Sequence, residues 1–580
     1  MSKPEQLITE HIDIWTSAIL AKSTAGRGSS KKYELYGIKK LRELILELAV
    51  RGKLVPQDTN DEPASILLEK ITTEKARLVR QGKIKKAKPL ANISEQEKLF
   101  DLPKDWVWCR LQDIGYDLGQ KKPDVDFTYI DVGSINKDLG VIKEAKVLNI
   151  DEAPSRARKL VKKGTVIYST VRPYLLNIAI IEKDFVPEPI ASTAFAIVHP
   201  LEGVSSNFIY RYLRSPSFVG YVESCQTGIA YPAINDKQFF NGLIPLPPKE
   251  EQNRIVAKVD ELMLLCNQLE QQTQTSIDAH ATLVESLLAT LTDSADANEL
   301  AQNWARISEY FDSLFTTEQS IEALKQTVLQ LAVMGKLVPQ NTGDEPASVL
   351  LEKIAEEKEQ LIRDKKIKKE KSLLTITDDE KPFELPQGWV WCRLQSISSK
   401  ITDGDHQTPP RISSGYRLLS AKNIRDGFLD MDNCDYISEA DYIKSRERCC
   451  PEKGDILIVS VGGTIGRSSL VSNDDQFALV RSVAMIKPLL FNSAYLKYAM
   501  DSPFLQNSIH SNKRGGAQPC LYLSEISKFV FAMPPLEEQK RIVAKVDELM
   551  RISDQLKDKL QQSQVTQIQL TDTLIEKSLA

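Results

Sequence analysis

The chain has 580 residues, of which 42% are hydrophobic and 27% charged, and a formal net charge of −4. This length allows about four domains of ordinary size. No apolar run approaches the roughly 20 residues of a membrane helix, and the first residues lack a signal-peptide core, so we expect a cytoplasmic multi-domain protein. The eight cysteines form no C-x-x-C pair, which excludes the usual zinc cages.

The N-terminal part opens an internal repeat. GKLVPQ at 52, DEPAS at 61 and WVWCRLQ at 106 all recur 283 residues later, and RIVAKVDELM at 254 recurs 287 residues later. Between these blocks, residues 113–246 and 396–533 look almost unrelated to each other. A duplicated frame therefore carries two different inserts. This layout predicts a single-chain pseudo-dimer that shows one surface twice and reads two unlike half-sites.

Helices are predicted over residues 38–54 and 62–82, with copies over 318–337 and 345–364. The second helix of each pair leads into a lysine-rich tail, GKIKKAK in the first copy and DKKIKKEK in the second. We interpret these tails as solvated linkers, with phosphate contact as the alternative.

The inserts are predicted to be mixed α/β domains. GTVIYSTV (164–171) and GDILIVSV (454–461) are β-branched runs after turns and are expected to be equivalent strands. ASTAFAIVHP (191–200) matches LVRSVAMIKP (479–488), and an aromatic-rich helix should follow each. The Gly-Ala-Pro loops at 227–232 and 514–519 then correspond. The inserts therefore share one fold and differ where a reading surface would vary.

A long helix follows each insert. Its apolar positions step by three and four, a spacing typical of a coiled-coil seam: Ile255, Val259, Leu262, Cys266 and Leu269. The first helix should end near Leu291, with a polar turn or linker at 293–303, and pair with helix 318–337 as an antiparallel hairpin. The copy, from 536 to 580, has no downstream partner. We therefore expect the two ends of the chain to meet, with helix 536–580 beside helix 38–54.

Charge is distributed unevenly between frame and inserts. Residues 104–247 carry 17 basic against 16 acidic residues and residues 387–533 carry 17 against 15, which leaves −7 for the rest of the chain. The first insert contains a run without any acidic residue: Arg156, Arg158, Lys159, Lys162, Lys163 and Arg172. Such clustering suits phosphate neutralisation, although a solvated strand edge can produce the same run.

The repeated frame, the Trp-rich segment before each insert and the P-P-x-E-E-Q-x-R-I-V-A-K-V-D-E-L-M segment after it resemble the specificity subunit of type I restriction-modification systems. The closest likeness is to the branch with a long N-terminal extension. The resemblance implies an α+β (mixed) fold in which long antiparallel coiled-coil helices join two α/β target-recognition domains. The expected divisions are a helical extension (1–103), target-recognition domain 1 (104–247), a central helical spacer (248–386), target-recognition domain 2 (387–534) and a C-terminal helix (535–580).

The resemblance also implies that each target-recognition domain reads half of an asymmetric, interrupted duplex DNA site. The helices would set the spacer and dock two methylation subunits. Those partners would use S-adenosylmethionine to methylate adenine N6, and ATP-driven, Mg²⁺-dependent restriction subunits would cut DNA. None of that chemistry is expected in this chain, which should be a non-catalytic subunit with no cofactor and no metal of its own.

Candidate DNA-binding residues lie in loops beside the strands, since Arg and Gln can contact guanine and adenine edges with two hydrogen bonds. Besides the basic run, the first domain offers Ser169, Thr170, Gln226, Thr227 and Tyr231. The second offers Asp403, His406, Ser460, Thr464, Arg481, Lys513, Arg514 and Gln518. The alternative for Arg172 and Arg481 is pairing with local carboxylates.

Two other functions stay open at this point. Asp124, Glu144 and Lys146 match the pattern of a metal-dependent nuclease core, in which carboxylates hold Mg²⁺ and the lysine orients water. The second insert has no equivalent of this pattern. A coiled-coil scaffold without nucleic acid would explain the frame, but it would leave two folded and divergent inserts unexplained.

Overall fold

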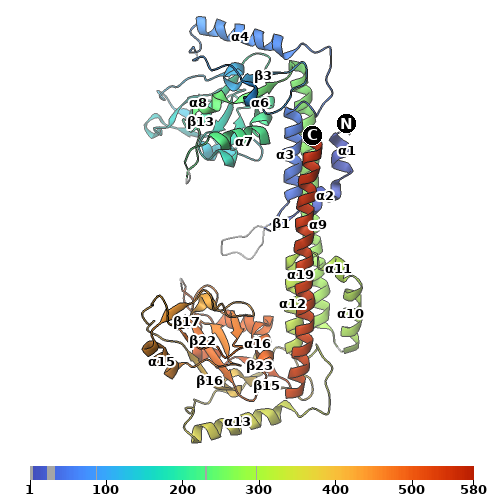
Figure 1. Ribbon diagram of the computed structural model, residues 1–580, viewed down its shortest axis with the longest axis vertical. Coiled ribbons are helices and arrows are strands. Elements are labelled where there is room, and N and C mark those ends of the chain that lie inside the picture. Colours follow the sequence, from blue (N-terminus) through green and yellow to red (C-terminus); the bar gives the residue numbers. More distant parts are fainter. Residues whose placement is uncertain (1–3, 22–32, 87, 229–230, 296, 517) are drawn as a thin grey trace. The chain divides into compact units, whose positions relative to one another are not determined.

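A computed structural model describes residues 4–21, 33–86, 88–228, 231–295, 297–516 and 518–580. The chain forms two compact units, unit 1 (residues 1–275 and 563–580) and unit 2 (residues 276–562). Each unit holds one copy of the frame and one insert, and the two long helices, α9 and α19, contribute to both units (Figure 1). The fold combines helices and sheets, as the sequence predicts.

The helices of the frame in unit 1 are α1 (Pro4–Thr9), α2 (Ile12–Ser17), α3 (Tyr36–Val50) and α4 (Ala64–Arg80), with a short hairpin of β1 (Leu20–Ala21) and β2 (Tyr33–Glu34). Those of unit 2 are α10 (Ala297–Glu309), α11 (Phe311–Leu314), α12 (Glu318–Val333) and α13 (Ala347–Arg363). The long helices are α9 (Lys249–Asp293) and α19 (Leu536–Leu579). Among the helices of the described ranges, none is long and apolar enough to cross a membrane.

The predicted seam of α9 is buried along its whole length in unit 1. Ile255, Val259 and Cys266 are 0% exposed and Leu262 is 1% exposed. Burying an aliphatic side chain of this kind stabilises a fold by about 1.5–3 kcal/mol, so this stripe holds the helix against its neighbours.

Helix α3 runs antiparallel to the first half of α9. Arg42 pairs with Glu270 at 2.5 Å, and Gln57 Nε2, just beyond α3, donates to Glu251 Oε1 at 2.7 Å. The residue number rises along one helix as it falls along the other, which defines their opposite directions.

The end of α19 completes the helical bundle of unit 1. Tyr36 Oη donates to Asp572 at 2.8 Å, and Lys53 Nζ donates to the Leu579 carbonyl oxygen at 2.6 Å. The C-terminal helix therefore lies beside α3, and the prediction that the two ends of the chain meet is confirmed.

Unit 2 repeats this bundle with a covalent link where unit 1 has the chain ends. Lys336, the copy of Lys53, donates to the carbonyl oxygen of Thr292 at 2.7 Å, and Thr292 is the copy of Leu579. Lys325 pairs with Asp554 of α19 at 2.6 Å. The predicted linker at 293–303 is wrong from Ala297 onward, where α10 begins. Leu300 in this stretch and Trp304 directly after it pack against the core of unit 2, so burial on one face stabilises a helix there.

An identical junction ties each insert to its long helix. Trp106 Nε1 donates to Glu251 Oε2 at 2.9 Å, and Trp389 Nε1 donates to Glu538 Oε2 at 3.1 Å. Both carboxylates sit in the first turn of their helix, and burial raises the pKa of each. The hydrogen-bonded indole thus fixes the start of the insert against the start of the helix.

The first insert holds two four-stranded sheets, ordered β11-β10-β13-β4 and β8-β5-β12-β9, and the pair β14-β3 at its base. Its elements are β3 (Val107–Arg110), α5 (Leu111–Ile114), β4 (Gly115–Tyr116), β5 (Phe127–Ile130), β6 (Ile135–Asn136), β7 (Val141–Ile142), β8 (Lys146–Leu148), β9 (Ala157–Leu160), β10 (Val166–Ser169), β11 (Ile178–Ile180), β12 (Pro189–Ser192), β13 (Phe195–Pro200), α6 (Ser206–Leu213), α7 (Pro216–Cys225), α8 (Asp236–Asn241) and β14 (Leu243–Leu246).

The second insert holds the sheets β16-β22-β19-β20 and β18-β17-β21 and the pair β15-β23. Its elements are β15 (Val390–Arg393), α14 (Leu394–Ile397), β16 (Ser398–Asp403), β17 (Tyr416–Leu419), β18 (Asp435–Ile437), α15 (Glu439–Arg448), β19 (Ile456–Val459), β20 (Ser468–Leu470), β21 (Phe477–Leu479), β22 (Val483–Pro488), α16 (Ser493–Asp501), α17 (Pro503–Asn512), α18 (Leu523–Ile526) and β23 (Val530–Met533). The predicted equivalent strands are β10 and β19. Strand β10 pairs antiparallel with β13, and β19 pairs in the same way with β22, which is the predicted equivalent of β13.

Candidate nucleic-acid interface

The loops at one end of β10 in the first domain are joined by backbone hydrogen bonds. Arg172 N donates to the Pro232 carbonyl oxygen at 2.8 Å, and Ile234 N donates to the Thr170 carbonyl oxygen at 3.0 Å. A third bond joins Thr193 N to the Arg156 carbonyl oxygen at 2.8 Å. Segments that are far apart in the sequence therefore form one surface.

Arg172 is an exposed cation of this surface. Its backbone has φ 48°, the left-handed region, and its guanidinium carbon lies 4.9 Å from the centre of the Tyr231 ring. Tyr231 is 68% exposed. Among the described residues, no carboxylate pairs with Arg172. The exposed guanidinium therefore lies over an aromatic ring, which favours contact with an external acceptor over the local pairing considered above.

Several candidates of the first domain have internal roles. Ser169 donates to the Val171 carbonyl oxygen at 2.9 Å, and Thr170 donates through Oγ1 to the Ala194 carbonyl oxygen at 2.9 Å. Both side chains are buried. Hydroxyl groups used in this way position the loop. Gln226, at the end of α7, is half-buried, and its Oε1 has no hydrogen-bond partner among the described residues.

Lys159 is enclosed in the domain and is not exposed as a phosphate-binding residue would be. It is 2% exposed and pairs with Asp236 at 2.6 Å and Asp117 at 3.0 Å. Burial alone would lower the pKa of Lys159, but the two carboxylates outweigh it and raise the pKa above its ordinary value. The charge of Lys159 is therefore used inside the protein.

The basic run is divided by the fold. Arg156 is exposed next to Thr193, on the surface that holds Arg172, whereas Lys162 and Lys163 lie in the turn that precedes β10. This turn is at the opposite end of β10 from Arg172. Arg158 is half-buried on β9, which pairs with β12 at the sheet edge.

The second domain joins its loops by the same scheme. Gly462 N donates to the Pro519 carbonyl oxygen at 3.0 Å, and Leu521 N donates to the Ser460 carbonyl oxygen at 2.7 Å. Arg481 N donates to the Asp405 carbonyl oxygen at 3.0 Å, which adds the end of β16 to this surface. All the candidates of this domain therefore lie on connected loops, and most are exposed: His406, Thr464, Arg481, Lys513, Arg514 and Gln518.

Asp403 and Ser460 are buried members of that set. Asp403 pairs with Arg448 and lies 3.2 Å from His406 Nε2. Arg448 Nη2 also lies 2.8 Å from His406 Nε2. The carboxylate is thus neutralised by Arg448 and positions both side chains. Arg448, which is 44% exposed, was missed by sequence reasoning because it ends a helix (α15) without counterpart in the first domain.

The shared hydrogen-bond scheme shows which positions correspond. Gly462 takes the place of Arg172, because their backbone N–H groups donate to the equivalent carbonyl oxygens of Pro519 and Pro232. Arg481 stands where the first domain has Thr193, which is also exposed. Thr227 corresponds to Arg514, since each pairs across its loop, with Ala233 and Cys520 respectively.

Glycine closes the corresponding loops in both domains. Gly228 has φ +90° and Gly515 has φ +94°. A Cβ on Gly228 would lie 2.8 Å from the Tyr231 carbonyl oxygen, and one on Gly515 would lie 3.1 Å from that of Gln518. Only glycine fits this backbone without strain. The tight loop is retained in both domains, while Tyr231 and Gln518 differ at the same position.

The residues of the nuclease pattern do not assemble into a metal site. Asp124 is exposed and pairs with Lys121 at 2.9 Å, and Lys146 lies on β8. Within the described part of the chain, no group of three or more His, Cys, Asp or Glu residues could hold a metal ion. These positions therefore give no support to a nuclease.

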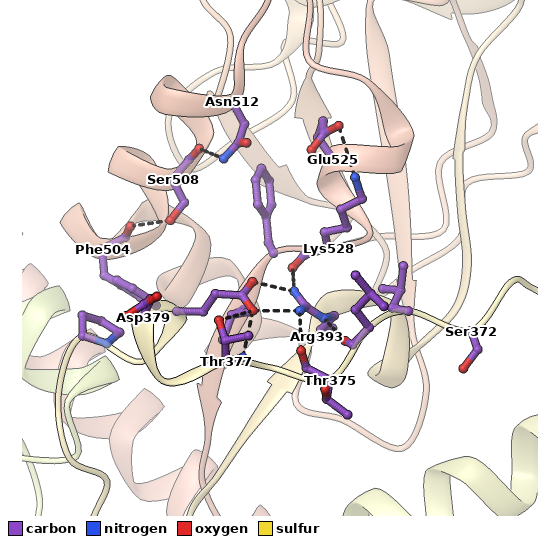
Figure 2. A pocket seen from close by; sticks show the side chains of 16 residues that line it. Ser372, Thr375, Thr377, Asp379, Arg393, Phe504, Ser508, Asn512, Glu525 and Lys528 are labelled. Atoms are coloured by element: carbon purple, nitrogen blue, oxygen red, sulfur yellow. Dashed lines mark hydrogen bonds and ion pairs between the residues drawn. The ribbon is translucent and has the colours of Figure 1, made fainter.

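A pocket of about 640 Å³ lies in unit 2, between the segment that precedes β15 and the helix α17. Figure 2 shows it beside Arg393, whose Nη1 donates to Glu380 at 3.0 Å and to the Lys528 carbonyl oxygen at 2.8 Å. Ser508, on the pocket wall, occupies the position of Tyr221 in unit 1. The hydroxyl of Tyr221 donates to the Gln238 carbonyl oxygen at 2.7 Å. The pocket therefore opens where the first unit has a tyrosine ring.

Two domains of similar fold thus present different exposed side chains on loops that share one backbone scheme. The family of the type I restriction modification DNA specificity domain matches residues 103–279 and 413–563. The chain belongs to this family, and it is a non-catalytic specificity subunit of a type I restriction-modification system.

Two relatives from Escherichia coli match the chain over nearly its whole length. The type I restriction enzyme EcoAI specificity subunit is 42% identical over 99% of both chains. The EcoEI specificity subunit is 40% identical, also over 99% of both chains. A chain from a structural study of complex assembly and conformational transition of the type I R-M system has a TM-score of 0.51 at 23% identity. That likeness covers 83% of this chain and 99% of the other, and it shows the fold.

Proposed function

We propose that residues 104–247 and 387–534 are two target-recognition domains, each of which reads one half of an asymmetric, interrupted duplex DNA site. One observation carries the proposal. The two domains keep the same loop backbone but place different side chains at equivalent positions, Arg172 and Gly462, Thr227 and Arg514, and Tyr231 and Gln518. A protein that reads two different sequences with one fold needs this combination, because base edges are distinguished by side-chain donors and acceptors.

The exposed loop residues are the proposed DNA contacts. In the first domain they are Arg156, Arg172, Thr227 and Tyr231, with Gln226 at the margin; in the second they are His406, Thr464, Arg481, Lys513, Arg514 and Gln518. Ser169, Thr170, Asp403, Ser460 and Lys159 are proposed to hold these loops in place. Arg158, Lys162 and Lys163 are proposed as phosphate contacts outside the loop surface.

The frame is proposed to set the spacing of the two half-sites and to dock two methylation subunits, one on each copy. A frame seen twice in the same form suits two copies of one partner. Those partners would use S-adenosylmethionine to methylate adenine N6, and restriction subunits with ATP and Mg²⁺ would cut DNA.

The test is a titration of duplex binding by the full chain at increasing salt concentrations. A DNA-binding protein releases counterions from phosphates, so its affinity falls steeply as salt rises. We expect this dependence, together with no cleavage when Mg²⁺ is added. A chain that binds no duplex at low salt would be a scaffold. Cleavage abolished by Asp124→Asn would instead support the nuclease.

A further inference from the structure

Each copy of the frame carries a tail of exposed lysines after its second helix. Four positions are lysine in both copies: 83 and 366, 85 and 368, 86 and 369, and 88 and 371. All eight side chains are exposed. Two neighbouring positions change, since Gly82 corresponds to Lys365 and alanine 87 corresponds to Glu370, whereas Ile84 and Ile367 are the same residue. The duplication has therefore retained the charges while neighbouring residues diverged.

Both tails are fixed at the same place on their own domain. Gln112 Nε2 donates to the Lys88 carbonyl oxygen at 3.0 Å, and Gln395 Nε2 donates to the Lys371 carbonyl oxygen at 3.1 Å. Gln112 and Gln395 lie in the first helix of each insert, α5 and α14. A solvated linker needs no such anchor. The tails instead present their charges at one defined edge of each target-recognition domain.

The second tail adds a charge at a strained position. Gly82, just after α4, has φ 69°. Lys365 takes the same position after α13 and has φ 58°. A side chain in this left-handed region is unfavourable by about 1 kcal/mol, whereas glycine adopts it freely. Lysine therefore replaces the residue that the backbone favours, and the gain is one more exposed positive charge.

Most lysines of the tails form no ion pair with another described residue. Across the described ranges, the ion pair formed by these lysines is Lys366 with Asp364, at 3.7 Å. The segments outside the inserts carry a net charge of −7, so the tails are basic segments within an acidic frame. Clustered exposed lysines create a positive potential that attracts an external anion, and a bound anion offsets their mutual repulsion.

We propose that the two lysine tails bind the phosphate backbone of duplex DNA next to each half-site, whatever its base sequence. This inference rests on the proposed function. It explains why the tails are alike while the loops differ, since the two half-sites differ in bases but share one backbone. A protein partner fits less well. Interface cores favour aromatic, Met and Arg residues and are depleted in Lys, and the tails contain only Ile84, alanine 87 and Ile367 as apolar residues. Both isoleucines are half-buried.

The test measures binding of the full chain to a long mixed-sequence duplex as a function of salt. The variant carries Lys83→Gln, Lys85→Gln, Lys86→Gln and Lys88→Gln, and its matched variant carries the same changes at 366, 368, 369 and 371. Each lost phosphate contact makes the slope of log affinity against log salt less negative by about 0.9. We expect a change of up to about 3–4 for each tail, with the methylated sequence in cells unchanged.

The control changes Lys70→Gln and Lys353→Gln on the same helices. These lysines already pair with Glu62 and Glu345, both at 2.7 Å, so the slope should stay near that of the parent chain. An unchanged slope in the tail variants overturns the inference. If the tail variants keep the slope of the parent chain but no longer co-purify with methylation subunits, the tails contact a protein, which also overturns the inference. Failure of the parent chain to bind any duplex would contradict the proposed function itself.

Discussion

Arg172 offers a test in which recognition and stability respond in opposite directions. Its guanidinium is exposed over Tyr231, but its backbone lies in the left-handed region at φ 48°. The equivalent position in the second domain is Gly462, with φ 107°. Arg172→Gly therefore removes the proposed base contact and relieves the backbone, whereas Arg172→Ala removes the contact and keeps the strain.

The magnitudes follow from these two features. A guanidinium that contacts a guanine edge with two hydrogen bonds contributes about 1–3 kcal/mol, or roughly 5- to 150-fold in affinity. Both variants should lose this amount, and only against the half-site read by the first domain. Glycine in place of a residue with φ 48° removes strain of about 1 kcal/mol. Arg172→Gly should therefore unfold at the same temperature as the parent chain or higher, and above Arg172→Ala.

The assay pairs fluorescence anisotropy with calorimetry. Duplexes would carry the site identified by methylation mapping, intact or with one half scrambled. Equal weakening of both variants on scrambled and intact duplexes would make Arg172 a phosphate contact. Unchanged affinity would exclude it from the interface, and a lower unfolding temperature for Arg172→Gly than for Arg172→Ala would refute the backbone argument.

Three further outcomes are expected. Ser508→Tyr should fill the pocket of unit 2 and raise its stability by about 0.5–2 kcal/mol, while Tyr221→Ser destabilises unit 1; calorimetry that shows no gain for Ser508→Tyr would refute the equivalence of these positions. Burial lowers the pKa of His199 to about 4, below its unfolded value near 6.5. Between pH 6.5 and pH 4 the unfolded state therefore binds more protons than the folded state, and the free energy of unfolding falls as the pH drops through this range. Solvent screens this partly buried ring, so the loss of stability should be on the order of 1 kcal/mol. Thermal melting at pH 7 and pH 4.5 should show a smaller loss in His199→Gln than in the parent chain, and an equal loss in the two proteins would exclude His199 as its source. A four-residue insertion after Thr275 lengthens α9 by about 6 Å and should add one or two base pairs to the spacer, and altered half-sites in the methylation map would contradict this.

The frame was predictable because its evidence is local and repeated. The three-four spacing from Ile255 onward requires one buried stripe, and the structure buries it. The meeting of the chain ends followed from the order of the copies, and Lys53 and Lys336 make equivalent bonds in the two units. Two copies of each signal made chance agreement improbable.

The surface was less predictable because exposure depends on tertiary packing. Lys159 belongs to a basic run, yet Asp117 and Asp236 from other segments enclose it. Arg448 reaches the loop surface of the second domain only because α15 packs beside β16 and β21. The polar segment from Ala297 became a helix because Trp304 found a core to pack against. No sequence period reports such long-range partners.

The central claim is that each insert reads its own half-site, and exchanging one insert tests it most directly. Residues 113–246 would be replaced by the corresponding domain of a subunit with a different target, and the methylated sites would be mapped in cells that supply the partner subunits. We expect one half of the recognised sequence to change and the other half to be retained. A change in both halves, or in neither, would contradict it.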